Sequence, residues 1–234
     1  QMSNVTGALP VLSEIIATAH AAGVKVLVDG AQGIVHQPAD VTALKADFYA
    51  FSGHKLYGPT GVGVLYASAE CLAEMKPWIG GGKMVDQVSF DGFTAMAPPH
   101  GLEAGTPNIA CVCAFGATLD FLSTVDHRAA ARWSEALATD AEQQLAQLPG
   151  FRSFRQHNAP LLAFSFDGIH PSDMVTLLAE QKIAIRAGQH CAQPLMKALA
   201  IQGCLRASFA PYNNRQDVDA FVRAVRMAHD LLSE

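Results

Sequence analysis

The run of residues 25–29, Lys-Val-Leu-Val-Asp, constrains the fold more than any other part of the sequence. It is a short β-forming segment with little alternation between apolar and polar positions, which is typical of a strand buried on both faces. Residues 10–22 carry apolar side chains at helical spacing, and Gly23 predicts the end of that helix. A helix followed by a buried strand is the repeating unit of α/β folds.

The same alternation continues through the first half of the chain. Helices that alternate with buried strands predict an α/β layer around a parallel or mixed sheet. A long segment rich in Gly and Pro interrupts the pattern, and such loops in compact domains are usually functional. The predicted elements are strands at 47–52 and 62–67, a helix at 69–76, the loop at 77–107, and long helices at 108–125 and 128–148.

The pattern restarts after Pro149 and Gly150, which predicts a second, smaller unit of the α+β class. The long helix before that point is predicted to bridge two units, so domains are expected at residues 1–125 and 126–234. The predicted elements of the second unit are strands at 161–166, 184–187 and 204–210 and helices at 171–181 and 215–232.

Composition excludes several classes of protein. The formal net charge of −5 argues against a nucleic-acid partner or an anionic membrane surface, because both bind clustered Lys and Arg. No stretch reaches the roughly 18 apolar residues of a spanning helix, and no charged-then-apolar leader for secretion is expected. The five cysteines match neither an even disulfide framework nor a paired zinc pattern, so a reducing, cytoplasmic location is expected.

Asp29 stands directly after the first predicted strand and opens the sequence Asp-Gly-Ala-Gln. Open α/β sheets bind ligands beyond the carboxyl ends of their strands, so a carboxylate here can face a ligand. Taken alone, Asp-Gly is ordinary turn chemistry, and a turn residue is the simpler interpretation. The Gly-x-Gly-x-x-Gly pattern of dinucleotide-binding proteins follows no strand of this sequence.

Lys55 closes the sequence Ser-Gly-His-Lys, which follows the predicted strand at 47–52. Ser52 and His54 can donate hydrogen bonds to a phosphate, and a lysine whose charge is suppressed becomes an amine able to form an imine. In isolation, a surface lysine before a Gly-rich turn is the simpler interpretation. The two segments together favour a site for pyridoxal phosphate (PLP), which needs an acid, a donor for its phenolic oxygen, phosphate ligands and a lysine.

Four blocks of the sequence resemble class V PLP-dependent enzymes, the cysteine desulfurase and selenocysteine lyase family. They are residues 28–32, 51–59 and 103–108, together with 186–192, which is similar to the cysteine loop of group II desulfurases of the SufS and CsdA kind. The resemblance implies PLP-dependent transferase fold type I, like aspartate aminotransferase. Residues 1–125 would be the remainder of the large PLP-binding α/β domain, and residues 126–234 the small α+β domain with the catalytic cysteine loop.

The resemblance implies a role for each residue around the cofactor. Lys55 would form the Schiff base with PLP. Asp29 would pair with the pyridine nitrogen, and Gln32 would contact the phenolic oxygen. Ser52 and His54 would bind the phosphate.

Further roles concern the substrate and a partner subunit. Asn4 matches an asparagine near the cofactor oxygen and the substrate carboxylate. Arg206 matches the arginine that binds the carboxylate, a task that suits a planar guanidinium, and Arg186 is a second candidate. The alternative for Arg206 is a surface charge on an edge strand. Thr106 matches a threonine that reaches the phosphate of the neighbouring subunit, which implies a homodimer.

Cys191 is the expected nucleophile. The resemblance implies conversion of L-cysteine to L-alanine, with a persulfide on Cys191 that passes to an acceptor protein of the SufE or CsdE type for iron–sulfur cluster or other sulfur-transfer pathways. A thiolate is the attacking species, so a neighbouring positive charge would help, and His190 is adjacent in sequence. The histidines outside these motifs are interpreted as surface or capping residues, except His100, which lies in the loop before Glu103 and is not assigned.

Two alternatives stay open. The sequence Gly-Gln-His-Cys at 188–191 is similar to the CsdA subgroup, which also uses cysteine sulfinate and selenocysteine. A selenocysteine lyase, a cysteine sulfinate desulfinase or another class V aminotransferase is therefore an alternative enzyme. Family members extend further on the N-terminal side, where they carry a phosphate-binding turn and a histidine that stacks on the cofactor. The second alternative is an inactive fragment that keeps only dimer or partner surfaces.

Overall fold

The computed structural model describes residues 1–233, and the chain divides into two compact units. The first unit comprises Gln1 and residues 10–125. The second comprises residues 2–9 and the chain from Asp126 onward. The sequence also placed a boundary between residues 125 and 126, but it assigned residues 2–9 to the first unit. These residues pack instead with the second unit, where Val5 is fully buried.

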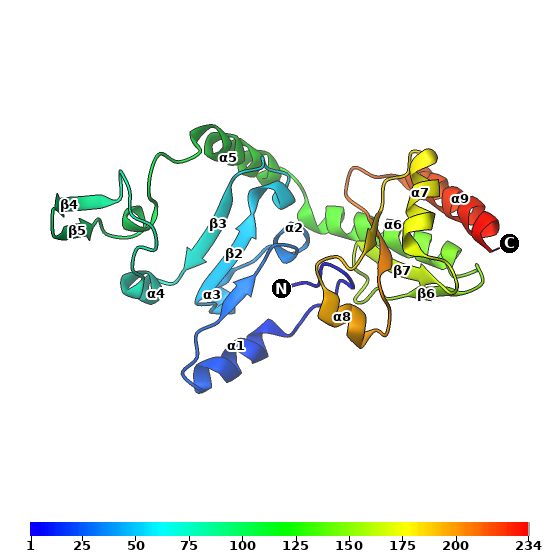
Figure 1. The fold of residues 1–234 in the computed structure, drawn as a ribbon, viewed down its shortest axis with the longest axis horizontal. Helices are drawn as coiled ribbons and strands as arrows, with labels where there is room; N and C mark the ends of the chain where they lie inside the picture. The colour runs from blue at the N-terminus through cyan, green and yellow to red at the C-terminus, as the bar shows by residue number, and fades with distance from the viewer. Residues whose placement is uncertain (234) are drawn as a thin grey trace. The chain divides into compact units, whose positions relative to one another are not determined.

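The first unit contains a three-stranded mixed sheet, as the alternation of helices and strands predicted (Figure 1). Strand β1 (Leu27–Asp29) runs parallel to β2 (Phe48–Ser52), and β2 runs antiparallel to β3 (Gly63–Ala67). Helix α1 (Leu12–Ala21) covers one face, where Ile16 packs with Val28 and Tyr49. The expected burial of β1 on both faces is wrong. Among the described residues β1 is an edge strand with only Val28 buried.

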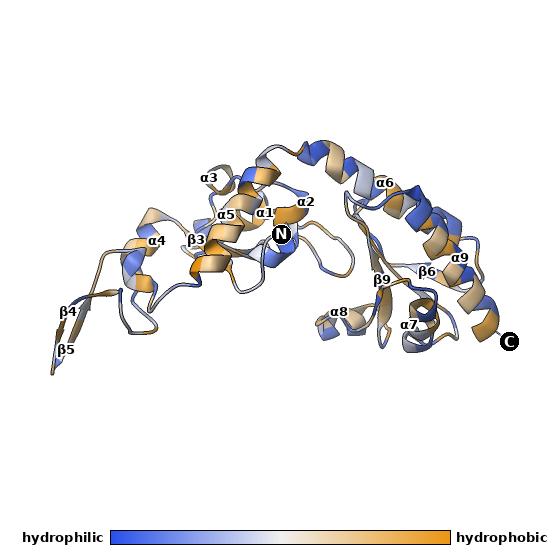
Figure 2. Ribbon diagram, turned by 90° about the horizontal axis from the view of Figure 1, so that it is seen from above, coloured by the Kyte–Doolittle hydropathy of each residue, from blue (hydrophilic) through white to orange (hydrophobic). Residues whose placement is uncertain are grey.

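The remaining elements of the first unit surround this sheet. Helix α5 (Ile109–Ser123) contributes Phe115 and Leu122 to a cluster with Leu56. Figure 2 shows α5 as apolar along most of its length, although Ile109 and Phe121 are exposed. The short elements are α2 (Gly33–His36), α3 (Val41–Leu44), η1 (Gly53–Leu56), α4 (Ala69–Glu74) and η2 (His100–Leu102).

A hairpin occupies the middle of the segment that was predicted as a loop. Strands β4 (Val85–Ser89) and β5 (Gly92–Ala95) pair antiparallel and lie beyond α4 in Figure 1. Phe90 and Val88 on this hairpin are exposed. Ser89 pairs with Gly92, so Phe90 and Asp91 form the turn, and the Asp-Gly pair at its end is turn chemistry that could have marked its position.

The second unit is built on a four-stranded antiparallel sheet in the order β6-β7-β9-β8. Three long helices cover one face of the sheet, and a short helix that the sequence did not predict lies on the other (Figure 1). The strands are β6 (Phe151–Ser153), β7 (Leu161–Phe166), β8 (Arg186–Gly188) and β9 (Cys204–Ser208). The helices are α6 (His127–Leu145), α7 (Pro171–Glu180), α8 (Gln193–Ala198) and α9 (Arg215–Leu232).

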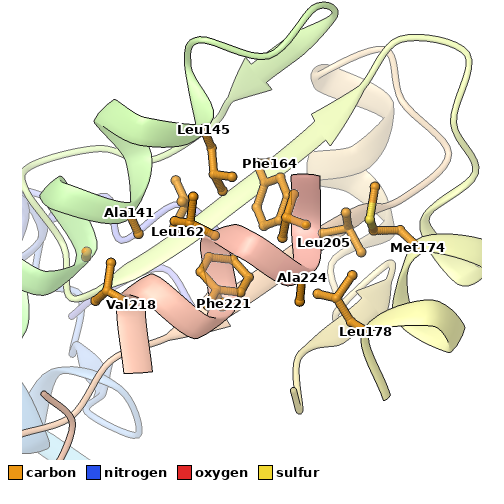
Figure 3. Close-up of a cluster of buried hydrophobic side chains, with 14 of the residues drawn as sticks. Ala141, Leu145, Leu162, Phe164, Met174, Leu178, Leu205, Val218, Phe221 and Ala224 are labelled. Atoms are coloured by element: carbon orange, nitrogen blue, oxygen red, sulfur yellow. The ribbon is translucent and has the colours of Figure 1, made fainter. Parts of the chain in front are cut away.

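The main core of the second unit lies between β7 and the helices α6, α7 and α9. Figure 3 shows Leu162 and Phe164 of β7 against Phe221 of α9, with Leu145 of α6 and Met174 of α7 around them. The rings of Phe164 and Phe221 meet edge to face with centroids 6.2 Å apart. Strand β7 is buried on both faces. The sequence pattern had predicted such burial for β1, the first strand of the chain.

The opposite face of this sheet is covered by residues 2–9 and α8. Val5, Ala163, Met196 and Cys204 form a small buried cluster there. The backbone oxygen of Thr6 accepts a hydrogen bond of 2.7 Å from the amide of Gln156, which fixes the segment. Because side chains alternate along β9, this is also the face on which Arg206 lies.

The helices were compared with the length and composition that a membrane span requires. No single helix in residues 1–233 is both long and apolar enough to cross a membrane, and α5 and α6 meet these criteria only when they are taken together.

Replacing Phe164 by alanine tests the assignment of the core. Phe164→Ala is expected to lower the free energy of unfolding by about 3–5 kcal/mol, because apolar burial is lost and a cavity remains. Tyr212→Ala, at a side chain that is 77% exposed, is the control, with an expected change within about 0.5 kcal/mol. Chemical denaturation of the full-length protein measures both, and equal effects would contradict the placement of Phe164.

Candidate active site

The parallel pairing of β1 and β2 brings the acid and the lysine to one edge of the first unit's sheet. Asp29 is opposite Ala50 in the register, and the amide of Gly30 donates to the oxygen of Ala50 at 2.8 Å. The 3₁₀-helix η1 starts directly after β2 and carries Lys55 on its single turn. Carboxyl ends of parallel strands face the same side, so Asp29 and Lys55 share this edge.

Tyr49 fixes the backbone that follows Asp29. A side chain at Gly30 would place its Cβ within 2.3 Å of the Tyr49 ring, so only glycine fits there. Burial, with a smaller contribution from the Asp29 charge, raises the pKa of Tyr49 to about 12, so the phenol keeps its proton. The Oδ1 atom of Asp29 accepts from the amide of Ala31 at 2.8 Å, which orients the carboxylate.

The segments next to Gln32 and Lys55 pack into the same small hydrophobic cluster. Gln32 precedes α2, and Ile34 and Val35 of that helix pack against Leu56 of η1. Lys55 is exposed. Four polar side chains at this edge make no hydrogen bond or ion pair to any residue in 1–233, so their polar groups are available to a ligand: Gln32, Ser52, His54 and Lys55.

Thr106 lies on the loop between η2 and α5. Its loop is tied down by the amide of Gly105, which donates to Gly82, and by Asn108, whose Nδ2 donates to the oxygen of Gly61 at 3.2 Å. In the part of the chain that the structure describes, no hydrogen bond joins Thr106 to Lys55 or its neighbours. Thr106 itself is exposed on this loop.

Two arginines stand opposite each other in the second unit. Arg186 of β8 is the cross-strand partner of Arg206 of β9, so both side chains lie on one face. Strand β9 lies between β7 and β8, so the alternative that Arg206 sits on an edge strand is wrong. Two positive charges that face each other across neighbouring strands repel, and a bound anion would offset this repulsion. The arginine pair therefore indicates an anion-binding site.

Arg206 is partly buried and firmly held. Its Nη1 donates to the backbone oxygen of Asn4 at 2.7 Å, whereas its Nε is buried without a partner among the described residues. Burial lowers the pKa of Arg206, and the charge of Arg186 lowers it further. The guanidinium stays protonated under ordinary conditions, because arginine starts from a very high value. It is therefore a permanent cation with unused donors.

Cys191 is exposed in the loop between β8 and α8. It lines a cavity of about 570 Å³ on the second unit. Arg186 also lines this cavity, so a thiol and a guanidinium face the same space. The lining residues are Arg186, Gln189, His190, Cys191, Gln193 and Pro194.

His190 does not supply the positive charge that its position beside Cys191 suggested. Its side chain is buried, and its Nε2 lies 3.1 Å from the backbone oxygen of Cys204. Burial lowers the pKa of His190 more than the hydrogen bond to Cys204 raises it, and the charges of Arg206 and Arg186 lower it further. The ring is therefore neutral near neutral pH. A cation beside the thiol comes from Arg186 instead.

Asn4 makes a contact that the sequence did not reveal. Its Nδ2 donates to the backbone oxygen of His190 at 2.8 Å, and its own backbone oxygen accepts from Arg206. The structure thus brings Asn4, Arg206, Arg186 and Cys191 together in one unit. No local sequence pattern predicts such contacts, because residues 4 and 190 come together only when the second unit is folded.

The remaining cysteines and histidines are outside this group. Cys204 is fully buried, and burial raises the pKa of its thiol to about 11, which makes it unreactive. His170 caps α7 as predicted, but His229 is buried rather than exposed. Among residues 1–233, no three His, Cys, Asp or Glu side chains form a group that could hold a metal ion.

Comparison with known proteins places the chain in a family. A family model described as aminotransferase class-V matches residues 1–221. The chain belongs to the class-V aminotransferase family. Its motifs at Asp29, Lys55 and Cys191 were the basis of the resemblance to that family.

Relatives of this class-V chain carry names that refer to sulfur chemistry. It is 62% identical over 232 residues to the cysteine desulfurase CsdA of Escherichia coli, and 46% identical over 232 residues to a probable cysteine desulfurase of Vibrio cholerae. The alignments cover 99% of this chain but only 58% and 57% of those relatives. The chain therefore spans less than two thirds of the length of the curated relatives it matches.

Solved structures of the class confirm the predicted fold type. The crystal structure of Escherichia coli CsdA in its S-sulfonic acid form has a TM-score of 0.97 and covers 99% of this chain and 58% of the other. A variant of the cystine C-S lyase C-DES, with glycine covalently linked to its PLP cofactor, has a TM-score of 0.80 at 25% identity, and covers 96% and 58%. The architecture is fold type I, as the sequence predicted.

The buried His190 predicts a pH dependence of stability. In the unfolded chain its pKa is about 6.5, and in the folded protein it is lower, so the folded state binds fewer protons. The free energy of unfolding should therefore fall as the pH decreases through about 6.5 towards the folded pKa. His190→Gln is expected to flatten this part of the curve. Urea denaturation between about pH 5 and 8 measures it, and an unchanged slope in the variant would contradict the assignment.

Proposed function

We propose that this chain forms the lysine- and cysteine-bearing part of a PLP-dependent cysteine desulfurase. The observation that carries the proposal is Cys191, an exposed thiol in a cavity that also contains a guanidinium of the Arg186 and Arg206 pair. An ordinary aminotransferase needs an anion site for its substrate but no thiol beside it. Identity of 62% to a cysteine desulfurase supports the same assignment.

The edge of the first unit's sheet fits PLP. Asp29 would pair with the pyridine nitrogen, Gln32 with the phenolic oxygen, and Ser52 and His54 with the phosphate, while Lys55 would provide the amine of attachment. The unpaired polar groups and the exposed amine support this fit, since PLP requires these donors and one acid. When bound, the cofactor supplies an electron sink for charge that develops on the substrate α-carbon.

The remaining steps use side chains of this chain. Arg206, with Arg186 beside it, binds the carboxylate of L-cysteine, and the backbone oxygen of Asn4 holds Arg206 in place. The amine of Lys55 takes the α-proton. The thiolate of Cys191 attacks the substrate sulfur, so a carbon–sulfur bond breaks while a sulfur–sulfur bond forms. Cys191 then holds a persulfide, and the carbon skeleton takes up a proton and leaves as L-alanine.

We also propose a homodimer with shared sites. Thr106 would reach the phosphate bound by the partner subunit, which agrees with its exposed position. The hairpin β4–β5 offers apolar surface for such an interface, with Phe90 and Val88 exposed, and Trp78 in the segment before it is exposed as well. An acceptor protein of the SufE or CsdE type would then collect the persulfide sulfur for iron–sulfur cluster or other sulfur-transfer pathways.

A second substrate is favoured by the arginine pair. Cysteine sulfinate carries a second anionic group in place of the thiol, and Arg186 and Arg206 present two guanidinium groups on one face. The same cavity would accept selenocysteine, as in a selenocysteine lyase. A cytoplasmic location is proposed as well, because five free cysteines, two of them exposed, suit a reducing compartment.

Borohydride trapping of the cofactor tests the role of Lys55. With PLP added to the full-length protein, reduction is expected to leave a pyridoxyl group on the peptide that contains Lys55. Lys55→Ala should abolish that adduct, whereas Lys76→Ala, at another exposed lysine of the same unit, should leave it unchanged. Mass spectrometry of the digest identifies the modified peptide. An adduct that persists in Lys55→Ala would exclude this lysine as the site of attachment.

Replacement of the nucleophile separates the candidate reactions. Cys191→Ser is expected to reduce alanine formation from L-cysteine by about 100-fold or more, because a hydroxyl replaces the attacking thiolate. Cys113→Ser, at an exposed cysteine in the first unit, is the control and should have normal activity. Alanine is measured after incubation with each substrate. Full activity of Cys191→Ser on L-cysteine would contradict the proposal, and activity kept only on selenocysteine would favour the lyase.

A further inference from the structure

The loop that carries Cys191 has a strained backbone. Gly188, His190 and Cys191 have φ angles of 113°, 52° and 57°. Glycine adopts positive φ freely, but the Cβ atoms of His190 and Cys191 disfavour the left-handed region. Two consecutive residues of this kind persist only where surrounding contacts hold them.

The first holding contact is the ring of His190. Its side chain is only 5% exposed, and Nε2 lies 3.1 Å from the backbone oxygen of Cys204. A carbonyl oxygen can only accept, so Nε2 is the donor in this contact. Cys204 belongs to β9, which is bonded to strands on both sides, so the ring is tied to a rigid part of the sheet.

The second holding contact is the side chain of Asn4. Its Nδ2 donates to the backbone oxygen of His190 at 2.8 Å. Val5 and Thr6, the residues that follow Asn4, are buried, and the Thr6 oxygen is bonded to the amide of Gln156. The asparagine therefore acts from a fixed segment and not from a free end.

Asn4 also contacts the arginine of the anion site. Its backbone oxygen accepts from Nη1 of Arg206 at 2.7 Å. One residue thus touches both Arg206 and the loop of Cys191. Any displacement of the loop relative to Arg206 must break or stretch one of these two bonds.

We propose that Asn4 and His190 are positioning residues that hold the Cys191 loop in its left-handed conformation and set the place of the thiol relative to Arg206. The proposal rests on the proposed desulfurase function for its catalytic consequence, but the two holding contacts exist without it. His190 turns its ring inward and Cys191 is exposed, so the buried ring directs the thiol into the cavity beside Arg186.

The catalytic consequence follows from geometry. The Cys191 sulfur must meet a substrate whose carboxylate is held by Arg206, so the distance between loop and arginine sets the line of attack. Misplacement of a reacting group by about 1 Å can reduce a rate by about 100-fold. Loss of either holding contact is therefore expected to slow sulfur transfer with little effect on carboxylate binding.

Hydrogen exchange and single-turnover kinetics on the full-length protein test the proposal together. Asn4→Ala and His190→Ala should speed exchange of the peptide at 186–193 by about 10-fold or more, with no change in the β7 peptide at 161–166. Both should slow persulfide formation on Cys191 by about 10-fold, with KM for L-cysteine changed by less than about 2-fold. His190→Gln, which keeps a donor near Nε2, should restore both measurements to within about 3-fold of the original protein.

His229→Ala is the matched control. His229 is also buried, and its Nε2 also lies 3.0 Å from a backbone oxygen, that of Pro149, but it is in another part of the same unit. This variant should lower stability without selective exchange at 186–193. The proposal would be overturned if Asn4→Ala and His190→Ala raised exchange equally in all peptides. It would also be overturned if exchange of the loop peptide at 186–193 stayed unchanged in both variants. If the original protein forms no persulfide, the proposed function fails, and hydrogen exchange alone still decides on the holding contacts.

Discussion

Strand β9 is the constraint on which the second unit depends. Its alternate side chains serve two faces, because Leu205 and Ala207 enter the main core while Cys204 and Arg206 face residues 2–9 and α8. Burial of the first pair fixes the register with β7 and β8. That register places Arg206 opposite Arg186 and presents the backbone oxygen of Cys204 to His190. The anion site and the cysteine loop are thus consequences of how this strand packs.

In the first unit, a different pair of strands positions the candidate residues. One parallel contact, β1 with β2, brings the carboxylate of Asp29 and the turn that carries Lys55 to a common edge. The buried ring of Tyr49 then excludes any side chain at Gly30. Each unit therefore carries some of the residues of the proposed reaction. In both units a strand is the rigid support, and the reactive group lies on the loop or turn that follows it.

Much of this was accessible from the sequence, because it depends on local patterns. The strand at 161–166, the helix at 215–232 and the motif residues after each strand follow from periodicity and from short signatures. The β4–β5 hairpin was missed because its strands are exposed and lack a clear apolar alternation. The roles of His190 and Asn4 were missed for another reason. Burial of a ring and a bond between residues 4 and 190 are properties of the fold, which no spacing reveals.

The central claim is that sulfur passes from L-cysteine to Cys191 of this chain. The most direct measurement follows isotopically labelled sulfur after a single turnover of the full-length protein with labelled L-cysteine. One labelled sulfur atom is expected on the peptide that contains Cys191, together with one molecule of L-alanine for each persulfide. Label on the peptide of Cys113, or release of labelled sulfide with Cys191 unmodified, would contradict it.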